Sequence, residues 1–122
     1  MIQIPNSKTY DLEERTLNFA KRARDYVKSL LKTISSIEYG KQLIRSSGSI
    51  AANYIEANEA LGKKDFLMRI RISKKETKES RLWLILTEPV EELENEKQLL
   101  IKESNELMKI FGSIIEKSTI GN

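Results

Sequence analysis

Apolar and small residues recur at alternating intervals of four and three positions in four segments of this 122-residue chain. This spacing places them on one face of a helix that packs at a shallow angle in a bundle. It predicts helices over about 11–32, 36–61, 63–87 and 95–117. The four series are Leu12, Thr16, Phe19, Ala23, Tyr26, Leu30; Leu43, Ser47, Ile50, Tyr54, Ala57, Leu61; Phe66, Ile70, Ser73, Thr77, Ser80, Leu84; and Leu100, Ser104, Leu107, Phe111, Ile114.

Capping signals place the ends of the first two helices. Asp11 with Glu14, and Ser35 with Glu38, have the spacing of a capping box, in which two side chains satisfy free N–H groups at a helix start. Gly62 follows the second series and is expected to stop that helix, since glycine is the commonest residue after a helix end.

Proline separates the third and fourth helices. Pro89 disfavours helical geometry at Glu88, so the fourth helix begins either at Pro89 or at Asn95, which has Gln98 three residues on. We favour Asn95. Short connections imply antiparallel neighbours. The sequence therefore predicts an all-α, up-down-up-down four-helix bundle that occupies residues 1–122 as one domain.

Composition excludes several functional classes. The chain has no cysteine and no histidine, which removes disulfides, Cys/His zinc sites and histidine-based catalysis. Glu56 and Glu59 lie three apart, but a di-iron bundle site needs Glu-x-x-His, so we expect surface glutamates. No metal, cofactor or catalytic constellation is expected, and the protein is not expected to be an enzyme.

The hydropathy of the chain gives an expectation for its location. No apolar run reaches the 18 or so residues of a membrane span. The first residues also lack the layout of a signal peptide. We therefore expect no membrane association and a cytoplasmic location.

Basic residues concentrate in the first two-thirds of the chain. Segment 15–81 contains 16 Lys or Arg and 7 Asp or Glu, whereas the overall net charge is only +3. A helical projection gathers five cations, here called the basic stripe, on one side of the third helix. Three others, the first-helix cations, lie opposite the apolar series, or seam, of the first helix. Such faces suit a phosphate backbone, although a solvated charged face is the alternative. The basic stripe is Lys64, Arg71, Lys74, Lys75 and Lys78; the first-helix cations are Lys21, Arg24 and Lys28.

The end of the third helix is apolar on every side. Leu82, Trp83, Ile85 and Leu86 point in different directions around the axis, so one side would face water in an isolated bundle. We expect these four residues to contribute to a subunit interface. The alternative is that the loop 88–94 folds over them.

Small residues cluster in the second helix. The run Ser46-Ser47-Gly48-Ser49 is followed by Ala51-Ala52, and glycine in a helix interior costs about 1 kcal/mol relative to alanine. Either a neighbouring helix approaches closely here or the helix breaks at Gly48. The run lacks the spacing of a phosphate-binding P-loop.

The stretch 44–84, IRSSGSIAANYIEANEALGKKDFLMRIRISKKETKESRLWL, resembles four-helix bundle proteins encoded within intervening sequences of bacterial large-subunit ribosomal RNA. The similarity extends over nearly the whole chain. Members of that family resemble the accessory variability determinant of diversity-generating retroelements, a basic pentameric barrel implied to bind nucleic acid and a reverse transcriptase. The resemblance thus implies a homopentamer, and it implies no catalytic residue. Its markers are Arg45, Ser49, Asn53 and Glu56, followed by Lys64-Asp65-Phe66.

Two functional hypotheses follow from these features. The first is a non-enzymatic homo-oligomer that binds RNA or DNA through the basic stripe and the first-helix cations. The second is a scaffold for an unidentified protein partner, in which the charge only maintains solubility. Survival of nucleic-acid binding at physiological salt would distinguish the two hypotheses.

Overall fold

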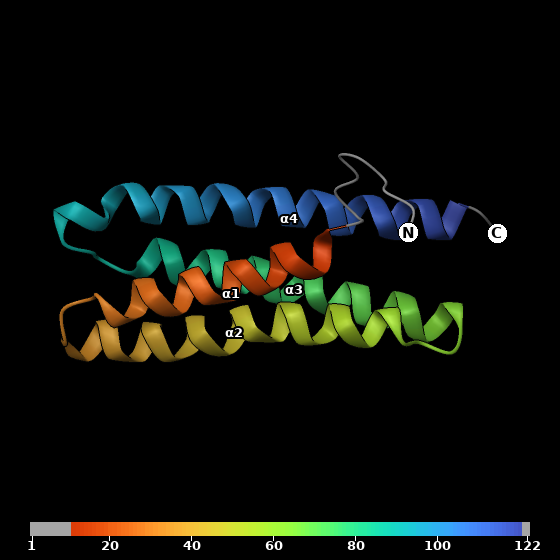
Figure 1. Cartoon of the computed structure of the whole chain (residues 1–122), viewed down its shortest axis with the longest axis horizontal. Coiled ribbons are helices and arrows are strands. Elements are labelled where there is room, and N and C mark those ends of the chain that lie inside the picture. Colours follow the sequence, from red (N-terminus) through yellow and green to blue (C-terminus); the bar gives the residue numbers. More distant parts are fainter. Residues whose placement is uncertain (1–10, 121–122) are drawn as a thin grey trace.

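A computed structural model describes residues 11–120 of the chain, which form four long helices and one short one (Figure 1). The helices are α1 (Leu12–Lys28), α2 (Ile34–Asn58), α3 (Lys63–Leu86), the 3₁₀ helix η1 (Glu91–Leu93) and α4 (Glu94–Ile120). The described residues contain no strand. The all-α four-helix bundle predicted from the seam spacing is therefore confirmed.

The helices run alternately up and down, and each connects to its neighbour by a short turn (Figure 1). α2 packs against both α1 and α3, and α4 packs against α3 and, less extensively, against α1. α1 and α3 therefore occupy diagonal positions of the bundle, with α1 in front and α3 behind in Figure 1. This arrangement decides which surfaces can act together.

The predicted seams form the core. All members of the first series are buried, and so are those of the other three series except three residues. Phe66 and Ile114 are half-buried, and Leu61 is fully exposed. Leu61 was expected in the core because the series was continued to residue 61, but α2 ends at Asn58 and the helical register is lost before Leu61.

Polar side chains in the seams bond within the core. Ser73 Oγ donates to the carbonyl oxygen of Ile50 at 3.0 Å, which ties α3 to α2. The hydroxyls of Ser46 and Ser80 lie 2.7 Å apart across the same pair of helices. Buried hydroxyls that find partners cost little stability, so a half-polar seam is compatible with a packed core.

The starts of α1 and α2 differ from the capping prediction. Asp11 lies at the N-cap of α1, yet its side chain makes no capping hydrogen bond, so the expected capping box with Glu14 is wrong. α2 is capped by Thr33, whose side chain accepts from Ser36 N while Ser36 Oγ accepts from Thr33 N. The capping box was therefore correct in type but two residues late in position.

Three other helix boundaries differ from those predicted from the sequence. α1 ends at Lys28 rather than near Lys32, and its last core residue, Leu30, is buried from the following turn. Gly62 is the N-cap of α3 and not the residue that stops α2. α4 begins at Glu94, one residue before Asn95, and continues to Ile120.

The small-residue run of α2 is part of an unbroken helix. α2 continues through Gly48, so the proposed break is wrong. A Cβ atom added at Gly48 would meet no heavy atom within 4 Å, so no neighbouring helix explains this glycine either. Close approach occurs instead at Gly40, where an added Cβ would lie 2.8 Å from Val27 Cγ1, and at the buried Ser46.

Candidate nucleic-acid interface

Three arginines of the basic segment form ion pairs with carboxylates of a neighbouring helix. Arg15 Nε and Nη2 donate to the carboxylate of Glu103 at 3.1 and 2.8 Å, linking α1 to α4. This side-chain hydrogen bond raises the pKa of Arg15, together with the charges of nearby carboxylates and against the effect of burial. Arg22 pairs with Glu96 in the same way. These cations are structural, and their charge is neutralised.

Arg45 links α2 to α3. Its Nη2 donates to Glu76 Oε1 at 3.2 Å and to Glu79 Oε1 at 3.1 Å. Asn53 joins the same two helices, since its Oδ1 accepts from Arg69 Nη1 at 3.0 Å. Arg45 and Asn53 are among the residues that carry the resemblance noted above, so these two markers stabilise the α2–α3 pair.

The basic stripe lies on the outward face of α3. All five of its side chains are exposed, and within residues 11–120 none of them forms an ion pair with a carboxylate. Lys74 leans toward α4, because its Nζ would lie 3.6 Å from a Cβ added at Gly112. The stripe therefore presents five cations to solvent without neutralising partners among the described residues.

The first-helix cations form a weaker and separate group. Lys21, Arg24 and Lys28 are exposed, but Arg24 Nε donates to Asp25 Oδ1 at 3.0 Å. This hydrogen bond lowers the pKa of the exposed Asp25. Because α1 and α3 are diagonal (Figure 1), α2 and α4 separate the helix that carries the first-helix cations from the helix that carries the basic stripe. The two groups therefore lie on helices that are not neighbours in the bundle.

An apolar groove runs beside the first half of the basic stripe. Its volume is about 850 Å³. Exposed Leu61, half-exposed Met68 and partly buried Ile72 supply its apolar surface, and three cations of the stripe lie along it. Sequence reasoning missed this groove because it assigned Leu61 to the core. The lining residues are Leu61, Gly62, Lys64, Asp65, Met68, Arg71, Ile72 and Lys75.

The apolar end of α3 divides into two parts. Leu82, Ile85 and Leu86 are about half exposed, so the loop 88–94 does not cover them. Trp83 instead packs within its own bundle, where its ring stacks on Tyr39 of α2 with centroids 6.0 Å apart. Its buried Nε1 has no hydrogen-bond partner within the described residues. Most of the Trp83 surface is thus unavailable to a second subunit.

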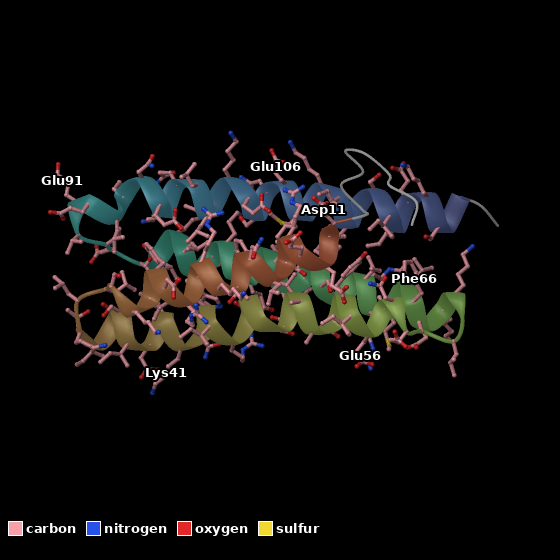
Figure 2. The ribbon with its side chains drawn as sticks, in the orientation of Figure 1. Asp11, Lys41, Glu56, Phe66, Glu91 and Glu106 are labelled. Carbon is pink, nitrogen blue, oxygen red and sulfur yellow. The ribbon has the colours of Figure 1, made fainter. Side chains whose placement is uncertain are left out.

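The acidic pair of α2 shows no sign of a metal site. Glu56 and Glu59 are exposed, and Figure 2 shows Glu56 projecting away from the bundle. No cluster of His, Cys, Asp or Glu within residues 11–120 could hold a metal ion. None of the helices in that range combines the length and the hydrophobicity that crossing a bilayer requires.

Comparison with known proteins places this bundle in a family. Residues 8–113 match the model of the 23S rRNA-intervening sequence protein family. The chain therefore belongs to the 23S rRNA-intervening sequence proteins.

A solved structure has the same fold. It is the crystal structure of a protein of unknown function from the S23 ribosomal protein family of Bacteroides thetaiotaomicron. It shares 31% sequence identity with this chain, with a TM-score of 0.73, and the alignment covers 85% of this chain and 97% of that one. Among curated proteins, no sequence matches this chain significantly.

Proposed function

We propose that this protein is a non-enzymatic homo-oligomer that binds RNA or DNA through the outer face of α3. The observation that carries the proposal is the basic stripe itself. Five exposed cations share one helix face without carboxylate partners among the described residues, whereas Arg15, Arg22 and Arg45 pair with carboxylates of neighbouring helices. Lys74 and Lys78, and likewise Arg71 and Lys75, are like charges one turn apart, which destabilises a free helix. A bound polyanion would relieve this repulsion.

The stripe suits the phosphate backbone better than the bases. Its five members carry no aromatic ring on which an unstacked base could lie, and stacking supplies much of the energy of single-strand recognition. Binding of this kind depends on counterion release, so it weakens as salt concentration rises. We expect little sequence preference.

Oligomerisation is the second part of the proposal. Leu82, Ile85 and Leu86 form an exposed apolar patch at the end of α3, and covering it in a subunit contact removes this surface from water. A pentamer is implied only by the family resemblance. An oligomer would repeat the basic stripe and the first-helix cations in each copy, and the number of phosphate contacts would rise accordingly.

A protein partner is the alternative. The groove beside Lys64 and Lys75 has an apolar floor formed by Leu61, Met68 and Ile72, which a phosphate backbone does not require. An acidic, amphipathic protein segment would use both features. On this alternative, nucleic acid binds only weakly and the groove is the main site.

Fluorescence anisotropy with labelled RNA and labelled duplex DNA tests the proposal. The variant is Lys74→Glu with Lys78→Glu, and the matched control is Lys102→Glu with Lys109→Glu, which makes the same charge change at exposed positions of α4. Titrations between about 50 and 200 mM salt give the slope of log affinity against log salt, which is about −0.9 per phosphate contact on duplex DNA and about −0.7 on single strands.

Three outcomes distinguish the proposals. Loss of affinity and a shallower slope in the α3 variant, with near-normal binding by the α4 control, support the basic stripe. Equal losses in both variants would show that only net charge matters, and no detectable wild-type binding at the lowest salt would favour the scaffold. The oligomeric mass of each variant is measured alongside.

A further inference from the structure

The outward face of α2 carries a second apolar series that its own bundle does not cover. Ile37, Ile44 and Ile55 are 43%, 46% and 44% exposed. They are separated by seven and eleven residues, which places all three on one side of a helix, away from the buried seam. We call this side the outer face of α2. A large apolar face on a helix surface is a candidate contact for a partner.

Gly48 lies in the middle of the outer face. It is exposed, and a Cβ added to it would meet nothing within 4 Å. Alanine would therefore fit and would favour the helix. A glycine that neither turn geometry nor intramolecular packing requires suggests that space is needed on the outside. Ala51 and Ala52 follow it, so the centre of the outer face is flat and its two ends are bulky.

We propose that the outer face binds the same face of a second copy, with the two α2 helices antiparallel and crossing between Gly48 and Ala51. Charge complementarity sets the direction. Lys41 lies in the first half of the helix, where its Nζ is 3.9 Å from Glu38 in an exposed ion pair. Glu56 lies in the second half, and Glu59 is the residue that follows the helix end. Lys41, Glu56 and Glu59 are all exposed. Figure 2 shows Lys41 and Glu56 projecting from α2 away from the rest of the bundle.

An antiparallel pair brings Lys41 of each copy near Glu56 and Glu59 of the other. A parallel pair would bring like charges together, which costs binding energy. The antiparallel register that centres on Gly48 and Ala51 also sets Ile44 opposite Ile55 of the second copy. Large side chains then meet at both ends and small ones meet at the crossing, as in contacts where helix backbones approach closely.

This contact has the two-fold symmetry in which each residue pair occurs twice. It goes beyond the proposed function, in which the subunit contact lies at the end of α3, on Leu82, Ile85 and Leu86. The experiments therefore change α2 alone. Neither outcome depends on whether the basic stripe binds nucleic acid.

Disulfide trapping tests the register directly, because the chain contains no cysteine of its own. A disulfide requires Cα atoms closer than about 7 Å. We expect an equal mixture of Gly48→Cys and Ala51→Cys proteins, whose cysteines lie opposite each other in this register, to form a mixed disulfide faster than either variant forms one with itself. Ser113→Cys, at an exposed position of α4, is the control. Cross-linking no faster than in this control would overturn the proposal.

Sedimentation velocity tests the contact without cross-linking. Gly48→Leu should lower the oligomeric mass, because the leucine side chain occupies the space at the crossing. Leucine also favours the helix more than glycine does, so the unfolding midpoint of the dissociated chain should rise. A purely intramolecular role for Gly48 would give no change in mass, and that result would overturn the proposal.

Charge exchange tests the pairing of the two isoleucines. Ile44→Glu and Ile55→Lys should each reduce the association, and the double variant should recover part of it because Glu then faces Lys across the contact. Leu99→Glu on α4, where the leucine is 44% exposed, is the control for a charge placed on an exposed apolar residue. Equal loss in this control, or no recovery in the double variant, would contradict the antiparallel pairing.

Discussion

The two interior glycines of α2 allow a sharp test of the packing, because the same substitution should have opposite effects at each. At Gly40 an added Cβ would lie 2.8 Å from Val27 Cγ1. Valine is restricted to one main rotamer in a helix, so the contact cannot be relieved by a simple rotation. Overpacking of this kind costs about 1–3 kcal/mol, and the gain in helix propensity offsets about 1 kcal/mol of it. We expect Gly40→Ala to destabilise the fold by about 0–2 kcal/mol.

At Gly48 the same change should stabilise the fold. Nothing lies within 4 Å of the added Cβ, so only the backbone entropy and helix propensity change. Glycine in a helix interior costs about 0.5–1 kcal/mol relative to alanine, and Gly48→Ala should gain that amount. Both variants replace glycine by alanine within the same helix. The difference between their free energies of unfolding therefore does not depend on intrinsic helix propensity.

The assay is urea denaturation followed by far-UV circular dichroism, at protein concentrations low enough to avoid association. Val27→Ala completes a double-mutant cycle, since it removes the methyl group that the new Cβ would strike. We expect Gly40→Ala to be less harmful in the Val27→Ala background, with a coupling of about 0.5–3 kcal/mol. Equal stabilisation by both glycine substitutions, or no coupling to Val27, would refute the packing at Gly40.

Three further predictions concern the core and the helix contacts. Burial raises the pKa of the Tyr26 phenol, so the folded protein holds this proton more tightly than the unfolded chain does. The contribution of this group to the free energy of unfolding is complete below the ordinary tyrosine pKa of about 10. It is lost as the pH rises through the pKa of Tyr26 in the folded protein. The free energy of unfolding, measured as a function of pH, should therefore fall above about pH 10, and Tyr26→Phe should reduce this fall. The same fall in the Tyr26→Phe variant would contradict the prediction. Ser46→Ala and Ser80→Ala should each cost about 1 kcal/mol because each leaves a buried hydroxyl without its main partner, and the double variant should cost less than the two losses together; strict additivity in denaturation experiments would refute their coupling. Arg15→Ala should cost about 1 kcal/mol through loss of the two bonds to Glu103, and this loss should shrink at high salt, whereas a salt-independent loss would indicate packing rather than charge.

Local sequence was sufficient to predict the four helices and most of their buried faces. A helix turns by a fixed angle per residue, so the spacing of Leu43, Ile50 and Tyr54 determines that they share a side wherever the helix lies. The same rule placed the basic stripe on one face of α3 and away from its seam. Family membership also followed from sequence, because the matching motifs span most of the chain.

Helix ends were less predictable because neighbouring residues offered equivalent caps. The segment Thr33, Ser35 and Ser36 contains three hydroxyls that could accept a backbone hydrogen bond, and local preference does not choose among them. In the structure Thr33 is the cap, and it exchanges hydrogen bonds with Ser36. Leu61 was wrongly assigned to the core for a related reason. Its spacing continues the four-three series of the second helix, but that spacing places it in the core only if the helix extends to residue 61.

Only the tertiary structure decided which surfaces face each other and which remain open. The diagonal positions of α1 and α3, which separate the first-helix cations from the basic stripe, depend on the order of the helices around the bundle. The stacking of Trp83 on Tyr39 and the contrast between Gly40 and Gly48 depend on the rotation and offset of one helix against another. Sequence periodicity describes each helix about its own axis, whereas these contacts are set by the joint packing of residues far apart in the chain.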